Sequence, residues 1–512
     1  NDLLVRGADP TAIYISEGPE AGYFYLYATS DLISNRGIMG WRSKDLHNWE
    51  VVGVVFLPEE ESWGRSSIWA PQIIYDESDQ TYYLYYSAHN SNQAGGYNET
   101  KYLGLATSKS PAGPFVQWTG TDLNGDEIGL GDPIFDLEKL SHDHPLYKPE
   151  QSFIDACPFL DPQTGDKYLY MVRSRYRAAT NEIWGVKMKD WATPDYSTLT
   201  RLTTVNRTTV GGDEPTDLYA GVIDEGPFMT YAHGKYYLTL SINGTTDKNY
   251  AVVQAIGDTP LGPFTKIQNA DGGLVLGAEL SWDHVSCAGH HSFIEVGEEL
   301  WIVYHQDLDR EFGGTKRGIA IDRVEWVLND KGQYVMRAVG PTYSVQPLPS
   351  FVTGYRNIAP EAKVTATNMK EGSSADYLND GLVQLHEISP IKEFEANAGR
   401  TTIAMEFDDY RTARAILVYN SWDYYKSFVQ IADITMSFKA EKDGKTVFGR
   451  ASIKNLAFDF ENYANVDFEM MRAGAAAIAE FDELLIKDIT ITIFSPEGQD
   501  GISISDIVVL GK

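Results

Sequence analysis

The first 350 residues repeat one arrangement of apolar and polar positions. A short apolar segment with small residues or proline is followed by a turn and then by an aromatic strand, as in YFYLYAT, TYYLYYS and KYYLTLS. Alternation with period two that is rich in Tyr and Phe predicts half-buried β-strands, and the turn residues between the strands predict hairpins. The pattern occurs in five copies, which begin at Ala8, Trp69, Asp155, Asp224 and Ala288.

The rest of each unit repeats as well. SPAGPF at 110–115 and TPLGPF at 259–264 each follow a strand-like segment, and GWRSKDLHNWEVVG and IWGVKMKDWATP are similar strand-and-turn stretches. Repeats of about 70 residues, each supplying a four-stranded unit, predict a five-bladed β-propeller over 1–350. A large β-sandwich with coincidental hairpins is the alternative, and five ordered copies disfavour it. This region holds no long amphipathic helix, which disfavours α/β folds.

The pattern changes after PLPSFVTGYRN. The segment 356–512 predicts a second all-β domain, with strands at TIAMEF, ARAILVYN, ITMSFKA, ITITIF and ISISDIVVL. The Ala-rich stretch MRAGAAAIAEF at 471–481 fits a helical turn or a buried strand equally well. We therefore expect an all-β protein in which the propeller is followed by a β-sandwich.

Charge and composition narrow the classes of partner. The 42 Lys and Arg residues against 72 Asp and Glu give a net charge of −30, which disfavours binding to nucleic acid or to an anionic membrane surface. No apolar run reaches the length of a membrane span, so we expect no membrane insertion. Cys157 and Cys287 are the only cysteines, and we expect both to be buried small apolar residues. The chain opens at Asn1 without an apolar leader, as a processed mature protein or a recombinant fragment would.

Acidic residues gather where the repeats begin. The innermost strands of a propeller line its channel, so Asp9, Asp155 and the pair Asp224 and Glu225 should converge although they are far apart in the sequence. Carboxyl groups at short range raise one another's pKa, and paired carboxyls are the equipment of glycoside hydrolysis. Strand alternation sends Asp224 and Glu225 to opposite faces, but aligning Pro158 with Pro227 places Asp224 opposite Asp155. Spacing alone leaves the choice between them open.

The motifs RGADP, SIWAPQI, FIDACPF, IDEGPFM and CAGHHSF, in this order, resemble glycoside hydrolase family 43. The resemblance covers the first 350 residues and implies inverting five-bladed propeller enzymes that act on glycans containing arabinose and xylose. By motif position it implies Asp9 as general base, Asp155 as the acid that orients and tunes its partner, and Glu225 as general acid. A base must be ionised and an acid must hold a proton, so burial beside Asp155 would usefully raise the pKa of Glu225.

Further residues are assigned by the same resemblance. It implies that Trp69 lines the sugar site and that Arg317 reaches it from the last blade, against core packing for Trp69 and a solvated strand edge for Arg317. His290 matches a histidine below the site that faces substrate, a structural calcium or water, whereas His291 fits a structural role. Asp132 and Asp161, each followed by Pro, fit turn formers.

The C-terminal segment is similar to discoidin or galactose-binding-like β-sandwich modules, through NIAPEAKVTATN, YLNDGLV, the YNS of ARAILVYNS and ISISDIVVLGK. Asn379-Asp380-Gly381 fits a turn first and a calcium loop second. Trp422, Tyr424 and Tyr425 could form a sugar platform, but packing is favoured.

The sequence therefore predicts an inverting glycoside hydrolase that releases α-L-arabinofuranosyl or β-D-xylosyl units from neutral plant cell-wall polysaccharides or oligosaccharides. We expect a secreted or periplasmic monomer that needs no cofactor for its chemistry and holds at most a structural calcium. An endo-acting arabinanase, with the inserted stretches 88–101 and 119–150 shaping the channel, and a non-catalytic glycan-binding propeller stay open. A fructan-acting propeller hydrolase is disfavoured because the chain has no Arg-Asp-Pro and no Glu-Cys motif.

Overall fold

The computed structural model describes residues 2–90, 100–136, 151–175, 181–218, 223–247, 249–277, 286–307, 316–342, 345–385, 391–458 and 474–512. The chain divides into two compact units, one over Asp2–Ala278 and Val285–Ala338 and the other mainly over Val339–Lys512. The predicted domain limits, 1–350 and 356–512, stay a prediction. No helix among the described residues is long and apolar enough to cross a membrane.

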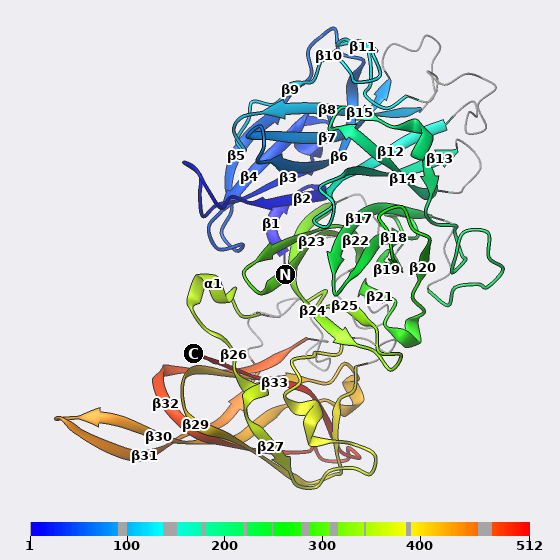
Figure 1. Ribbon diagram of the computed structural model, residues 1–512. Helices are drawn as coiled ribbons and strands as arrows, with labels where there is room; N and C mark the ends of the chain where they lie inside the picture. The colour runs from blue at the N-terminus through cyan, green and yellow to red at the C-terminus, as the bar shows by residue number, and fades with distance from the viewer. Residues whose placement is uncertain are drawn as a thin grey trace. The chain divides into compact units, whose positions relative to one another are not determined.

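The first unit is a ring of five antiparallel blades, which confirms the predicted propeller (Figure 1). The first blade is formed by β2 (Ala8–Tyr14), β3 (Phe24–Thr29), β4 (Ile38–Ser43) and β5 (Glu50–Phe56). The second is formed by β6 (Gly64–Asp76), β7 (Thr81–Asn90), β8 (Lys101–Ser108) and β9 (Val116–Gln117). The third is formed by β12 (Gln151–Leu160), β13 (Lys167–Arg175), β14 (Asn181–Asp190), β15 (Thr193–Pro194) and β16 (Thr200–Arg201).

The remaining two blades follow the same plan. The fourth is formed by β17 (Asp224–Ala232), β18 (Lys235–Ile242), β19 (Ala251–Gly257), β20 (Phe264–Lys266) and β21 (Leu274–Gly277). The fifth is formed by β22 (Ser286–Val296), β23 (Glu299–Asp307), β24 (Arg317–Leu328) and β25 (Tyr334–Ala338). A two-stranded ribbon, β10 (Gly120–Thr121) with β11 (Glu127–Ile128), lies outside the blades. The five predicted copies thus correspond to the first two strands of the five blades.

The ring is closed by the start of the chain. Strand β1 (Asp2–Arg6) pairs with β24 in the last blade, and the Gly7 N–H donates to the Arg317 carbonyl at 3.2 Å. Strand β1 was not predicted from the sequence, because a five-residue segment carries little periodicity of its own. The closure holds β2, with Asp9, directly against the fifth blade.

Tyrosines on the second strands join neighbouring blades. Tyr27 of β3 donates to the Pro111 carbonyl at 2.6 Å, Tyr170 of β13 donates to the Pro260 carbonyl at 2.9 Å, and Tyr85 of β7 donates to the Trp191 carbonyl. All three rings are fully buried, so each phenol needs the partner that it finds on the next blade. The aromatic strands of the sequence therefore serve contacts between blades as well as pairing within them.

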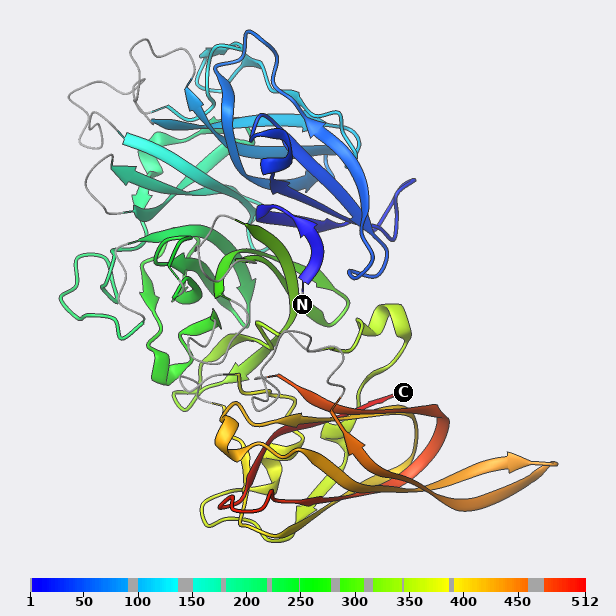
Figure 2. The same cartoon turned by 180° about the vertical axis from the view of Figure 1, so that it is seen from behind.

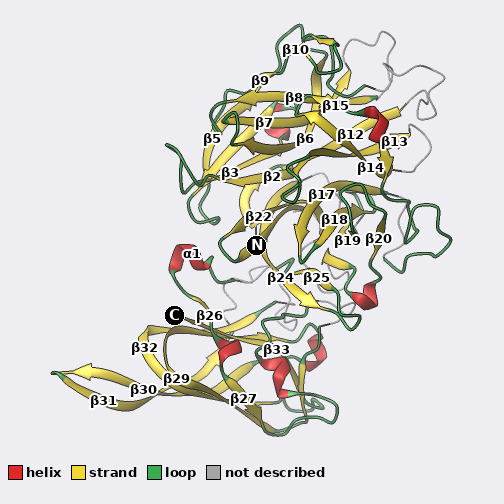
Figure 3. Cartoon of the chain, viewed as in Figure 1, coloured by secondary structure: helices red, strands yellow, loops and turns green. Residues whose placement is uncertain are grey.

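The second unit is an eight-stranded antiparallel sheet that follows the short helix α1 (Ser350–Thr353) (Figures 2 and 3). Its strands are β26 (Arg356–Asn357), β27 (Lys363–Ala366), β28 (Phe394–Ala396), β29 (Arg400–Asn420), β30 (Gln430–Lys442), β31 (Lys445–Ala457), β32 (Ala476–Phe494) and β33 (Ile502–Gly511). From Ala476 on, the Ala-rich stretch 471–481 belongs to β32, so the prediction of a buried strand holds there and that of a helical turn does not. Residues 471–473 lie outside the described residues.

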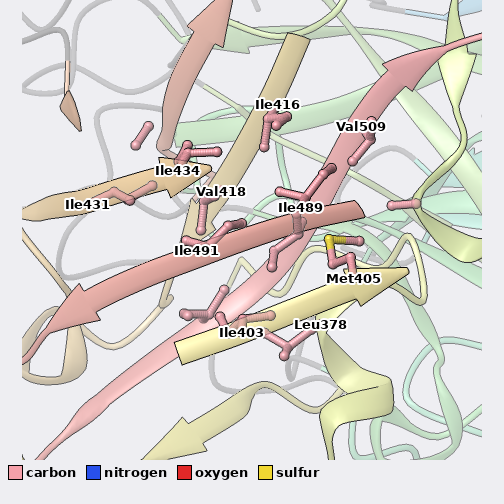
Figure 4. Packing of buried hydrophobic residues seen from close by; sticks show 14 of the residues in the cluster. Leu378, Ile403, Met405, Ile416, Val418, Ile431, Ile434, Ile489, Ile491 and Val509 are labelled. Atoms are coloured by element: carbon pink, nitrogen blue, oxygen red, sulfur yellow. The ribbon is translucent and has the colours of Figure 1, made fainter. Parts of the chain in front are cut away.

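Two long strands fold this sheet over its own core. The first part of β29 pairs with β27 and its second part pairs with β33, while β32 runs along both parts. The register shifts between Glu406 and Arg411, where the strand changes layer. Ile403 and Met405 from the first part pack in the same apolar cluster as Ile416 and Val418 from the second (Figure 4). This arrangement has the two facing layers of a sandwich, but the layers share strands.

The Asn-Asp-Gly segment and a group of three aromatic residues in this unit each had two interpretations from the sequence. Asn379-Asp380-Gly381 forms a turn: Gly381 has a φ of 80°, and Asp380 accepts the Leu382 N–H at 2.9 Å. Trp422 is half-buried and lines a polar pocket, whereas the Tyr425 side chain is 70% exposed. The Tyr424 side chain lies outside the described set. Packing of these residues against the propeller stays a prediction.

Candidate active site

Every inner strand carries the same β-bulge beside the central channel. The pairing register of β2, β6, β12, β17 and β22 shifts so that two residues of the inner strand face one of the second strand. The first residue of each bulge has a positive φ: Asp9 (50°), Ala70 (46°), Asp155 (58°), Gly226 (54°) and His290 (45°). Side-chain-bearing residues adopt this conformation at a cost, so the repeat marks a built feature of the channel.

The bulges of all five blades enclose one small cavity. It is lined by Pro10, Ala70, Pro71, Gln72, Asp155, Ala156, Gly226, Pro227, His290 and His291. Because the bulges interrupt the pleat, residues on either side of them face the channel where a regular strand would alternate. The structure thus brings together residues that lie more than 280 positions apart in the sequence, from Pro10 to His291.

Asp9 lies among three basic side chains. Its Oδ1 is 3.2 Å from His290 Nδ1, 3.4 Å from His305 Nδ1 and 3.3 Å from Arg317 Nη1. Its Oδ2 accepts a hydrogen bond from Thr29 Oγ1 at 2.7 Å. Burial acts to raise the pKa of Asp9, but the opposing interactions, of which those with His290 and Arg317 are the largest, hold it well below the usual value. Asp9 is therefore an ionised carboxylate over the whole neutral range.

Glu225 has the opposite environment. Its side chain is buried and accepts a hydrogen bond from Tyr250 Oη at 2.9 Å. Burial raises the pKa of Glu225 well above its usual value, and the negative charge of Asp9 adds to this rise. Hydrogen bonds from Tyr250 and Asn181 and the charge of Arg317 oppose it without cancelling it. Glu225 can therefore hold a proton at a pH at which Asp9 cannot.

The bulge register decides between Asp224 and Glu225. Glu225 precedes the bulge of β17 and faces Ser241, and it occupies the same position as Trp69 in β6 and Ile154 in β12. Asp224 points away from this site and pairs with Lys266 Nζ at 2.7 and 2.9 Å. The alignment of Pro158 with Pro227 was wrong. Pro227 is the second residue of its bulge and is therefore equivalent to Ala156, which is the second residue of the bulge in β12. The expectation that the two acids point to opposite faces is confirmed.

The Asp155 side chain binds the backbone next to Glu225. Its Oδ2 accepts the Gly226 N–H at 3.1 Å. In the other blades the first bulge residue donates its N–H to a side chain of a second strand, for example from Ala70 to Thr29 at 2.8 Å and from His290 to Ser241 at 2.8 Å. The corresponding residue of the third blade is Val172, which cannot accept. The Asp155 carboxylate replaces the missing acceptor and so fixes the backbone next to Glu225.

Burial raises the pKa of Asp155 too, with further rises from Glu225 and Asp9 and an opposing interaction with His290. Glu225 thus acts on the pKa of Asp155, as one carboxyl group does on another at short range. The tuning of Glu225 by Asp155 stays a prediction.

Two of the three predicted substrate residues, Trp69 and Arg317, lie near this site. Trp69 is half-buried, and Lys101 Nζ lies 3.9 Å from the centre of its ring, so the ring is held by a cation and is not simply part of the core. Arg317 is partly buried and reaches Asp9, so it is not a solvated strand-edge residue. Its guanidinium contacts the predicted base directly.

His290 and His291 have different roles in the packing. His290 is a neighbour of Asp9, as the contact above shows. His291 is buried, its Nε2 lies 2.7 Å from Thr239 Oγ1, and burial lowers its pKa to about 3, so it is a neutral structural residue as expected. No group of three or more His, Cys, Asp and Glu side chains in the described ranges is arranged to hold a metal ion. The metal role of His290 stays a prediction; its Nδ1 lies 3.2 Å from Asp9 Oδ1.

The competing acids are turn residues, as predicted. Asp161 accepts the Gln163 N–H at 3.0 Å, and Asp132 accepts the Gly129 N–H at 3.0 Å. Cys157 and Cys287 are both buried, as predicted. Of the two inserted stretches, residues 91–99 and 137–150 lie outside the described residues.

Three residues of the site were not found from the sequence. Tyr250, His305 and Thr29 each hydrogen-bond Asp9 or Glu225, but they lie on or before second and third strands, outside the motifs that open the repeats. Each sits in an aromatic or β-branched strand pattern that predicts only pairing. A comparison of residues facing the pre-bulge positions, blade by blade, could have marked Thr29 and His305.

Comparison with known proteins agrees with the geometry. The chain is 30% identical over 112 residues to the β-D-galactofuranosidase xynD of Aspergillus niger, a match that covers 21% of this chain and 30% of that relative. It is 25% identical over 286 residues to a β-xylosidase of Xylanibacter ruminicola, covering 50% of this chain and 70% of the relative. The crystal structure of a thermostable family-43 glycoside hydrolase superposes with a TM-score of 0.52 at 28% identity, covering 68% of this chain and 96% of that one. The sequence model of glycosyl hydrolases family 43 matches residues 3–331, and the chain belongs to this family.

Proposed function

We propose that this glycoside hydrolase removes α-L-arabinofuranosyl or β-D-xylosyl units from neutral plant polysaccharides or oligosaccharides with inversion at the anomeric carbon. The observation that carries the proposal is the pair of opposite environments of two interacting carboxyl groups, an ionised Asp9 and a proton-holding Glu225. Titratable groups whose pKa values are pushed apart are the mark of an acid and base pair. The names of the β-xylosidase and galactofuranosidase relatives support pentose and furanose substrates.

The chemistry needs two proton transfers. Asp9 accepts a proton from a water molecule while the water oxygen bonds to the anomeric carbon. The bond from that carbon to the leaving oxygen breaks, and Glu225 gives its proton to the leaving oxygen. Asp155 holds the backbone beside Glu225, and burial together with the charge of Asp9 keeps the pKa of Glu225 raised. Charge and protons balance, with Asp9 left protonated and Glu225 left ionised until water restores both.

The other expectations are proposals of the same kind. Trp69 offers a flat ring to a sugar face, and Arg317 and His290 lie where a bound sugar hydroxyl would meet Asp9. A structural calcium near His290 would need backbone carbonyls and waters as its main ligands, because calcium prefers oxygen. Neutral substrates suit the net charge of −30, and plant polysaccharides imply secretion or a periplasmic location.

The test is a proton NMR time course with arabinan and arabinoxylan oligosaccharides. Early signals of free arabinose or xylose with inverted anomeric configuration are expected. Inverted oligosaccharides would indicate the endo-acting arabinanase, and retained configuration would overturn the assignment of Asp9 as base. No release by the wild type would favour a glycan-binding propeller, with Glu225→Gln as the matched inactive control.

A further inference from the structure

Tyr250 lies directly behind the proposed acid. Its ring is fully buried, and its hydroxyl donates to Glu225 Oε1 at 2.9 Å. The residue that gives this ring its space is Gly289, the residue before the fifth bulge: a Cβ there would come within 2.4 Å of the Tyr250 ring. Blades four and five are therefore shaped to admit a tyrosine at this point.

The Tyr250 hydroxyl belongs to a chain of hydrogen bonds. The His290 N–H donates to Ser241 Oγ at 2.8 Å, and the Ser241 side chain is hydrogen-bonded to Tyr250. If Ser241 donates to Tyr250, the single hydroxyl proton of Tyr250 is free to point at Glu225. The chain then runs in one direction, from the bulge of the fifth blade to Oε1 of the acid.

The same ring stacks on the neighbour of the base. Tyr250 and His305 lie with ring centroids 5.6 Å apart and planes at 13°. His305 is fully buried, and burial lowers its pKa to about 4, so the imidazole is neutral at neutral pH. A neutral ring has one acceptor nitrogen, and Nδ1 uses it to accept the Asp9 N–H at 3.1 Å. One stacked pair thus contacts both carboxyl-bearing residues of the proposed reaction.

We propose that Tyr250 and His305 are positioning residues that fix the proton geometry of the reaction: Tyr250 holds Glu225 Oε1 as an acceptor, so that the transferable proton lies on Oε2, and His305 holds the Asp9 backbone in its bulge. The inference rests on the proposed roles of Glu225 and Asp9. After proton transfer Glu225 has no hydrogen left, so Tyr250 is then the donor to a charged oxygen. A hydrogen bond to an ionised group is stronger than one to a neutral group, so Tyr250 favours the product side of the transfer.

Some of the groups around Glu225 raise its pKa and others lower it. Asp9 and burial favour the protonated acid, while Tyr250, Asn181 and Arg317 favour the carboxylate. Asp155 adds a second negative charge when it is ionised. Removing the Tyr250 hydroxyl deletes one of the groups that favour the carboxylate, so Glu225 should stay protonated to higher pH and the basic limb of the pH profile should move up.

The test compares Tyr250→Phe with wild type in the pH profile of kcat/KM. On an unactivated pentose oligosaccharide we expect a loss of about tenfold to a hundredfold, and the basic limb should move up by about one pH unit. On an aryl glycoside with a good leaving group the loss should be much smaller, because that substrate needs little protonation. Tyr170→Phe is the matched control, since Tyr170 is equally buried and its hydroxyl donates to the Pro260 backbone carbonyl at 2.9 Å and to no carboxyl group. The Tyr170→Phe variant should leave the basic limb of the kcat/KM profile at the wild-type pH.

His305→Phe keeps a stacking ring but removes the acceptor. It should slow both substrates by a similar factor, because the base is needed for either leaving group. An unshifted basic limb in Tyr250→Phe, with Glu225→Gln inactive on the oligosaccharide, would overturn this inference and leave the proposed function intact. Full activity of Glu225→Gln on the oligosaccharide would overturn the proposed function itself.

Discussion

In the propeller the inner strands break their alternation beside a polar channel, whereas in the C-terminal unit the long strand β29 breaks its alternation at the edge of an apolar core. The propeller bulges hold Asp9, Asp155 and His290 in left-handed conformations with ionisable neighbours. The irregular pairing of β29 between Glu406 and Arg411 separates the two parts of the strand, and alternate residues of both parts are buried in one apolar core. Irregular strand pairing therefore serves chemistry in one unit and packing in the other.

Buried side chains affect the free energy of unfolding differently in the two regions. Buried charges in the propeller lower stability unless each has its partner, and they are kept because the site uses them. Buried isoleucines in the C-terminal unit contribute by leaving water and filling space. Substitutions in the first region should change rates and pH dependence, and substitutions in the second should change the free energy of unfolding.

The largest expected effect is on turnover. Asp9→Asn keeps the shape of the side chain but removes the charge that would accept a proton, so kcat should fall by about 10²–10⁴-fold. The loss should persist with an activated aryl leaving group, unlike the loss in Glu225→Gln. Steady-state kinetics of both variants on an aryl pentoside checks this. Equal recovery of both variants on the activated substrate would contradict the division of roles.

A buried ion pair next to the acid should show the cost of an unpaired charge. Lys266→Met removes the partner of Asp224 and should lower the free energy of unfolding by about 3–5 kcal/mol. The double variant Asp224→Leu with Lys266→Met should recover much of this loss, because no lone charge is then buried. Urea unfolding of the three proteins measures the difference. A single variant as stable as wild type would show that the pair is solvated.

In the C-terminal core the expected effect is one of packing. Ile489 is fully buried among the residues of both layers, and Ile489→Ala should cost about 2–5 kcal/mol. Leu485 lies on the same strand with 39% of its surface exposed, so Leu485→Ala is the control and should cost much less. Thermal and urea unfolding compare the two. Similar losses would mean that the inward face of β32 is misassigned.

The smallest effect concerns stability and pH. The pKa of Glu225 is raised in the folded state, so the folded protein binds a proton that the unfolded chain releases above a pH of about 4.3. Wild-type stability should therefore fall as pH rises from there through the folded-state pKa. Glu225→Gln should be no more stable than wild type at low pH and more stable by on the order of 1–2 kcal/mol near neutral pH. Unfolding measured across this range checks the trend, and a constant difference would contradict it.

The repeated strands, the turns between them and the acids at the start of each copy were all readable from the sequence. Alternation and turn chemistry are local, so five hairpins of Tyr-rich strands predict five blades without knowledge of their arrangement. The order of the motifs brought out Asp9, Asp155 and Glu225 together with Trp69, Arg317 and His290. Turn chemistry also placed Asp132 and Asp161 outside the site.

Only the tertiary structure decided which side chains meet. Period-two reasoning assumes a regular pleat, and the bulges break that pleat where Glu225 and Asp224 part, so no spacing rule could choose between them. The contacts of Tyr250 with Glu225, of His305 with Asp9, and of β1 with β24 join segments on different strands or at opposite ends of the propeller sequence. Such contacts depend on ring closure and on burial, which shift the pKa values of Asp9 and Glu225 in opposite directions and which no local pattern of residues encodes.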